Sequence, residues 1–98
     1  MSMNLMPGTT TLTADAVLGQ SGVAQRVYSV KILSGGTAGV VNLRNGTLVT
    51  DTIIDTLTGV ANTSKIFNFQ GGERFPAGCF YDEDANVTST TIVHTSEF

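Results

Sequence analysis

Cys79 and His94 are the two residues whose types could together support nucleophilic catalysis. The chain holds one cysteine and one histidine, and a cysteine nucleophile needs such a base beside it. Cys79 lies in the apolar run FPAGCF, and no nucleophile turn surrounds it. The pair also supplies too few ligands for a zinc site. We expect a buried thiol, a surface or interface histidine, no catalytic residue and no cofactor.

An acidic bend over residues 82–86, DEDAN, has the spaced oxygen ligands that open a calcium loop. The sixth place of that loop requires glycine and here holds Val87. The twelfth place requires a bidentate carboxylate and here holds Val93. We therefore predict a solvated turn between strands and no metal site, with an irregular cation site between subunits as the alternative.

The glycine-rich stretch Ser34–Gly39 has a superficial likeness to a phosphate-binding loop. Such a loop ends in Gly-Lys-Ser/Thr and leads into a helix, whereas here Val40 and Val41 follow and no lysine is present. The stretch is more typical of a loop between two strands.

Alternating apolar and polar residues predict the strands that position these groups. Within Val23–Leu33, Tyr28, Val30 and Ile32 alternate with Ser29 and Lys31, which is the period of a sheet with one buried face. Because a short glycine-containing loop follows, we predict that this strand forms an antiparallel hairpin with Gly39–Arg44. Asn45-Gly46 then predicts a type I′ turn into a third strand, Leu48–Leu57.

The remaining segments predict further short strands. They are expected at 65–69, 79–81 and 87–95, and at 9–13 or 14–18, where one helical turn is the alternative. No stretch offers helical spacing over a useful length. We predict an all-β chain with seven or eight short strands in a single antiparallel β-sandwich, jelly-roll or Ig-like. An extended N-terminal arm over residues 1–13 precedes the sandwich domain at 14–98.

The aromatic residues have two possible uses. A small domain without tryptophan needs most of them in its core, where each contributes about 2 kcal/mol. A ligand-stacking platform is the alternative. The residues concerned are Tyr28, Phe67, Phe69, Phe75, Phe80 and Tyr81.

The composition of the chain limits which classes of molecule it is expected to bind. The net charge is −3, and the five basic residues are scattered, which argues against nucleic acid. No apolar run approaches a membrane span, and the start lacks the features of a signal peptide. Charged residues make up only 13% of the chain, so Thr, Ser and Asn must cover the surface. Hydroxyl groups are cheaper to dehydrate than charges, so we expect a homo-oligomer, with a trimer as one option.

Five motifs resemble one family. They are Tyr28 in the first strand, Ser34–Gly39, Asn45-Gly46, Phe75–Gly78 and Asn86–Val93. Together they resemble the small all-β virion structural proteins of tailed bacteriophages, especially short-tailed marine phages. The resemblance covers residues 23–93 and implies a non-enzymatic particle component.

The resemblance does not identify the part of the particle; with the weakly charged, Thr-rich surface, our first hypothesis is a capsid decoration (cement) or surface-knob protein. It would be made in the host cytoplasm and sit on the capsid surface of the virion, bound to the major capsid protein or to neighbouring subunits. The interface residues predicted are Asn4, Leu5 and Met6 in the arm and Thr88, Thr90 and Ile92 on an outward face.

The alternative is a tail- or head-fibre module, an adhesin for host glycans. It would need an exposed aromatic and acidic cluster, for which Phe80, Tyr81, Asp82 and Asp84 are the candidates.

Overall fold

The computed structural model describes residues 8–97, which form eight β-strands and no helix. The strands are β1 (Gly8–Leu12), β2 (Ala16–Leu18), β3 (Ala24–Ser34), β4 (Val40–Asn45), β5 (Thr52–Thr58), β6 (Ser64–Phe75), β7 (Cys79–Glu83) and β8 (Val87–Glu97). The predicted all-β class and antiparallel sandwich are confirmed.

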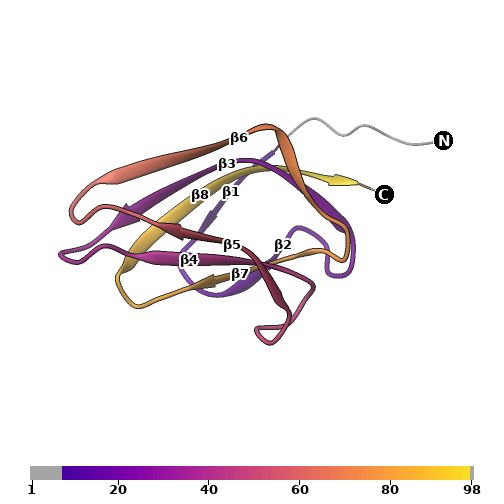
Figure 1. Ribbon diagram of the computed structural model, residues 1–98, viewed down its shortest axis with the longest axis horizontal. Helices are drawn as coiled ribbons and strands as arrows, with labels where there is room; N and C mark the ends of the chain where they lie inside the picture. Colours follow the sequence, from indigo (N-terminus) through magenta and orange to yellow (C-terminus); the bar gives the residue numbers. More distant parts are fainter. Residues whose placement is uncertain (1–7, 98) are drawn as a thin grey trace.

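The strands form two antiparallel four-stranded sheets that face each other (Figure 1). Sheet A has the order β1-β8-β3-β6, and sheet B has the order β2-β7-β4-β5. The first strand pairs with the last, the second with the second-to-last, and so on inward: β1 with β8, β2 with β7, β3 with β6, and β4 with β5. The chain is thus wound as one long double strand folded over into two layers.

The core lies between the two sheets. Val30 and Ile32 of β3 and Ile92 of β8 point inward from sheet A, and Leu43 and Tyr81 point inward from sheet B. All five are fully buried. Burying one such side chain contributes about 1.5–3 kcal/mol, so this double layer is what holds the strands in place.

The predicted hairpin between the Val23–Leu33 and Gly39–Arg44 strands is wrong. The corresponding β3 and β4 lie in different sheets. The glycine-rich loop crosses from one layer to the other, held by a Gly35 N–H that donates to the Asn86 carbonyl at 2.9 Å. A Cβ on Gly39 would lie 2.5 Å from the Val87 side chain. Gly39 therefore serves close packing against the β8 start rather than a reversal within one sheet.

The predicted pairing of the next two strands is correct, but their turn is not a type I′ turn. β4 and β5 pair from Val40↔Thr58 to Asn45↔Thr52, and the connection runs over residues 46–51. The Asp51 carboxylate accepts the backbone N–H groups of Thr47 and Leu48, each at 2.9 Å. This side-chain cap replaces the two-residue turn and delays the strand, which starts at Thr52 instead of Leu48.

The first strands settle the ambiguous N-terminal region. Residues 8–12, assigned to the predicted arm, form β1 and pair with β8 in sheet A. Residues 16–18 form β2 rather than the alternative helical turn. Within residues 8–97 no helix is long and apolar enough to cross a membrane.

Candidate functional site

His94 belongs to a buried network of neutral groups at the β1 end of the core. Its Nδ1–H donates to the Gln25 Oε1 at 3.0 Å, and its Nε2 accepts from the Thr10 hydroxyl at 2.7 Å. The Gln25 Nε2 lies 2.9 Å from the Ser96 hydroxyl. Burial lowers the pKa of His94, since the charged ring is disfavoured away from water. Through its two ring nitrogens, His94 links β8 to β1 and β3. The prediction that His94 lies at the surface is wrong.

Cys79 is fully buried, as predicted. It lies on β7 in sheet B, whereas His94 lies on β8 in sheet A. Burial, with a smaller contribution from the nearby Asp55 charge, raises the pKa of the Cys79 thiol to about 12. The thiolate needed for a nucleophile is therefore strongly disfavoured at neutral pH.

The acidic bend is used for internal bonds. Asp82 accepts from the Arg44 guanidinium at 2.9 Å, and Glu83 accepts the Tyr81 hydroxyl at 3.0 Å. Asp84 accepts the backbone N–H of Asn86 at 3.0 Å. Among residues 8–97 no group of three or more His, Cys, Asp or Glu side chains is arranged to hold a metal ion. Asp82 and Glu83 are the last residues of β7, and the turn itself covers residues 84–86.

The loop Ser34–Gly39 locks one end of the sandwich (Figure 1). The Gly39 N–H donates to the Ser34 hydroxyl at 2.9 Å. The Gly35 carbonyl accepts from Asn62 at 2.7 Å, and the Gly39 carbonyl accepts from Gly59 at 2.8 Å. Loops from β3–β4, β5–β6 and β7–β8 are therefore joined through their backbones, which makes this end rigid.

Two of the predicted interface residues face the wrong way. Thr90 and Ile92 are fully buried, whereas Thr88 is exposed. The reason is the phase of β8: the Thr90 hydroxyl contacts the core Tyr81 hydroxyl, so even positions from 90 to 94 point inward. The outward-face prediction for Thr90 and Ile92 is wrong. Asn4, Leu5 and Met6 lie outside the described residues.

Most of the aromatic side chains serve the core, as predicted; the exceptions are Tyr28 and Phe80, which are partly buried and lie outside the core cluster. Phe75 and Tyr81 are fully buried, and Phe67 and Phe69 pack against the core from β6. Because Tyr81 is buried and Asp82 is paired with an arginine, the aromatic and acidic cluster expected for a glycan adhesin is not presented at a loop tip.

The middle of the outer face of sheet A carries little charge. Two rows of outward side chains cross its four strands, Thr11–Thr91–Lys31–Ile66 and Thr9–Val93–Ser29–Asn68. Lys31 is the only charged member. Further along the same face, Glu97 accepts from Arg26 at 3.1 Å and from Arg74 at 2.9 Å. These rows form the neutral face, a name used below for the eight residues just given.

The outer face of sheet B is more apolar. Val17, Phe80 and Ile53 follow one another across its strands, with Arg44 between the last two. Large apolar side chains are also exposed in and beside the β4–β5 connection: Leu48, Val49, Ile53 and Ile54. This second face is interrupted by the Arg44–Asp82 ion pair.

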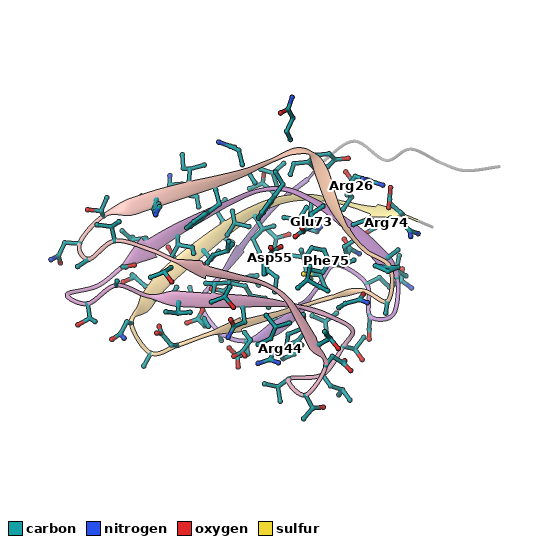
Figure 2. All side chains as sticks on the ribbon, viewed as in Figure 1. Arg26, Arg44, Asp55, Glu73, Arg74 and Phe75 are labelled. Carbon is teal, nitrogen blue, oxygen red and sulfur yellow. The ribbon has the colours of Figure 1, made fainter. Side chains whose placement is uncertain are left out.

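Two inward-pointing carboxylates, not predicted from the sequence, lie at the β5–β6 side. Asp55 lies opposite Leu43, and Glu73 lies opposite Val27, so both point into the sandwich (Figure 2). The Oδ2 atom of Asp55 and the Oε1 atom of Glu73 are buried without a hydrogen-bond partner. Burial raises the pKa of Asp55. Such unpaired buried groups carry a desolvation penalty.

A signal for both residues was present in the alternation of the strands. Asp55 is in phase with the buried Leu57, and Glu73 is in phase with the buried Phe75. A carboxylate in phase with core residues predicts an inward charge, which natural sheets use on edge strands.

Comparison with known proteins finds a likeness in fold alone. No protein-family model matches the chain, and no curated protein matches it. Its structure is similar to a chain from Bacillus endospore appendages, which form a family of disulfide-linked pili. The similarity has a TM-score of 0.54 at 15% identity and covers 100% of this chain and 89% of that chain.

Proposed function

We propose that the chain is a non-enzymatic structural subunit, a decoration (cement) protein that binds the assembled head shell of a phage. The neutral face is the observation that carries this proposal. Its rows hold one charge, on Lys31, and otherwise hydroxyl, amide or apolar side chains. Covering such a face with another protein dehydrates few charges, so association loses little to desolvation.

The strand order supports a jelly roll as the finer fold. Each sheet contains strands 1-8-3-6 or 2-7-4-5, and successive strands other than β4–β5 alternate between the sheets. An Ig-like sandwich pairs other strands, with ABED in one sheet and CFG in the other. Eight strands in two such sheets fit the jelly-roll plan better, and that plan is common in viral capsid proteins.

Rigidity of the unit also fits a role in a particle. The three loops joined by backbone hydrogen bonds fix one end of the sandwich. A stiff subunit loses less conformational entropy when a shell binds it. Many copies on one lattice can then hold through avidity although each contact is weak.

A filament subunit is the second candidate, because the fold is similar to that of a pilus chain. That pilus is disulfide-linked, whereas the one cysteine of this chain is fully buried. Copies of this chain would therefore have to associate through non-covalent contacts.

Binding to shells tests the first candidate directly. The purified chain is mixed with expanded empty heads of the phage whose virions it is proposed to decorate, and the heads are pelleted. We expect the chain to pellet with the heads and to saturate at a fixed ratio to the shell protein. Protein that stays in the supernatant would exclude the decoration role.

Matched substitutions locate the contact. Thr91→Glu and Ser29→Glu place carboxylates in the centre of the neutral face, and we expect them to weaken pelleting. Thr58→Glu, on the exposed edge of sheet B, is the control and should leave it unchanged. Electron microscopy of the chain alone tests the second candidate, since filaments formed without heads would favour it.

A further inference from the structure

The four edge strands of the sandwich are not equally open to another strand. Within residues 8–97, β1 and β6 end sheet A, and β2 and β5 end sheet B. An edge strand presents unpaired N–H and C=O groups, and proteins discourage its pairing with inward charges, bulges and short length.

The two strands on the β5–β6 side carry such devices. β5 has a bulge opposite Leu43/Arg44 and the inward Asp55. β6 has a register break opposite Val27/Ser29, with Gly71 and Gly72 at φ +80 and +81°. Glu73, opposite Val27, points inward, and the charged Lys65, which is exposed, lies opposite Ile32. An added strand would have to follow a bent edge and cover these charges.

The strands on the other side differ from each other. β2 has three residues, too few to hold a strand by itself. β1 has five, with the sequence GTTTL, and pairs with β8 without a register break. It contains no charge and no proline, and its three threonines are β-branched residues that favour strands. β1 is therefore the one edge among the described residues with none of the protective devices.

We propose that β1 pairs antiparallel with β1 of a second copy, so that two sheets A join into one continuous sheet. The twofold axis passes at Thr10. This register places Thr9 opposite Thr11 of the second copy and Gly8 opposite Leu12. The contact is isologous and closes at two copies. It goes beyond the proposed function because it concerns free copies in solution, without a shell.

The charge and shape of β1 favour a second copy as the occupant. The net charge of the chain is −3, but the paired β1 segments carry no charge. Two copies therefore meet at this edge without repulsion between like charges. Leu12 packs only partly against the core, and a neighbour could cover its remaining surface. A Cβ at Gly8 would have no atom within 4 Å, so the position opposite Leu12 offers room. Cross-strand Thr–Thr pairs are favourable.

The test is the mass of the full chain in solution, measured by sedimentation over rising concentration. The wild type should shift toward twice the monomer mass and stop there. A chain that stays monomeric at all concentrations overturns the proposal. So does a mass that grows beyond two, because an isologous contact cannot propagate.

Charge exchange tests the register. In Thr9→Lys/Thr11→Lys, lysines at positions 9 and 11 face each other across the axis twice, and we expect dimerisation to weaken roughly tenfold. In Thr9→Lys/Thr11→Glu each lysine faces a glutamate of the other copy, and dimerisation should return. If this second variant is as monomeric as the first, the register is wrong.

Two controls complete the design. Ser64→Lys/Asn68→Lys places the same charges on exposed positions of the β6 edge and should leave the dimer unchanged; loss there overturns the β1 assignment. Deleting residues 1–7 should also leave it unchanged, whereas loss would make that segment the occupant instead. A thermal melt of each variant confirms that the sandwich is folded.

Discussion

The two open sides of this sandwich treat polar groups in opposite ways. On the β1 side, the buried side chain that contacts β1 is neutral and hydrogen-bonded at both ring nitrogens: His94 is held by Thr10 and Gln25. On the β5–β6 side, the inward polar groups are charged, and Asp55 and Glu73 each leave a buried oxygen without a partner.

The difference shows that stabilising the fold and preventing a further strand from pairing with an edge are separate properties. A satisfied neutral network strengthens the fold but does nothing to repel an added strand. An inward carboxylate weakens the fold and keeps a neighbouring chain away. The β1 side therefore combines a hydrogen-bonded histidine with an unprotected edge strand, whereas the β5–β6 side combines unpaired carboxylate oxygens with protected edge strands. The following predictions test that contrast.

The largest effect is expected where the neutral network is broken. Gln25→Ala removes a fully buried side chain and leaves the His94 Nδ1–H without its acceptor. We expect a loss of about 3 kcal/mol in the free energy of unfolding, measured by urea denaturation at pH 7. Gln70→Ala, at an exposed position of β6, is the control and should change it by less than about 0.5 kcal/mol. Equal losses would contradict the importance of the network.

A gain is expected where an inward charge is removed. Burial raises the pKa of Asp55 above its ordinary value of 3.8, so the folded state favours the neutral carboxyl. The ionised form therefore destabilises the protein at pH 7. We expect Asp55→Asn to add on the order of 1 kcal/mol to the unfolding free energy at pH 7. The gain should shrink as the pH falls toward 3.8, and a gain that does not depend on pH would exclude this cause.

The histidine network should give a pH dependence of the opposite sign. The pKa of His94 is lower in the folded state than its ordinary 6.5, so the unfolded chain binds more protons between the two values. Stability is complete above pH 6.5 and falls below it, by at most about 1.4 kcal/mol per pH unit. Thermal melts between pH 7.5 and 5.5 measure this slope. His94→Gln should flatten it, and an unchanged slope would assign it to other groups.

The smallest effect is expected from an outward-facing charge on β6, the strand that carries the inward-facing Glu73. Arg74 donates to Glu97 at the surface, and its side chain is 52% exposed. Because solvent screens such a pair, Arg74→Gln should lower the unfolding free energy by less than about 0.5 kcal/mol. Glu73→Gln, one position away and pointing inward, should raise it instead. If Arg74→Gln and Glu73→Gln change the unfolding free energy in the same direction, the orientation of the side chain relative to the core does not explain the effect.

The local pattern predicted the strands more reliably than their partners. The alternation in Val23–Leu33 and the turn signal at Asn45-Gly46 correctly indicated β3, β4 and the β4–β5 pairing. The hairpin of β3 with β4 failed because a short glycine-rich loop can reverse within a sheet or cross between two sheets. Only the fit of Gly39 against Val87 selects the crossing.

The site residues divide in the same way. Cys79 in its apolar run was predicted to be buried, and it is. The inward phase of Thr90 and Ile92 depends on which face of β8 meets sheet B, and that choice was made wrongly from the strand alone. The unpaired state of Asp55 and Glu73 depends on what lies across the core from them, which no spacing along the chain reveals.

By itself the sequence determined an all-β chain with a weakly charged surface and no cluster of catalytic residue types, because alternation and composition are local properties. Tertiary structure decided which strands are neighbours, which polar groups are satisfied and which edge is left unprotected. These depend on contacts such as β1 with β8, between segments at opposite ends of the chain. Such contacts form only when the chain folds and brings distant segments side by side.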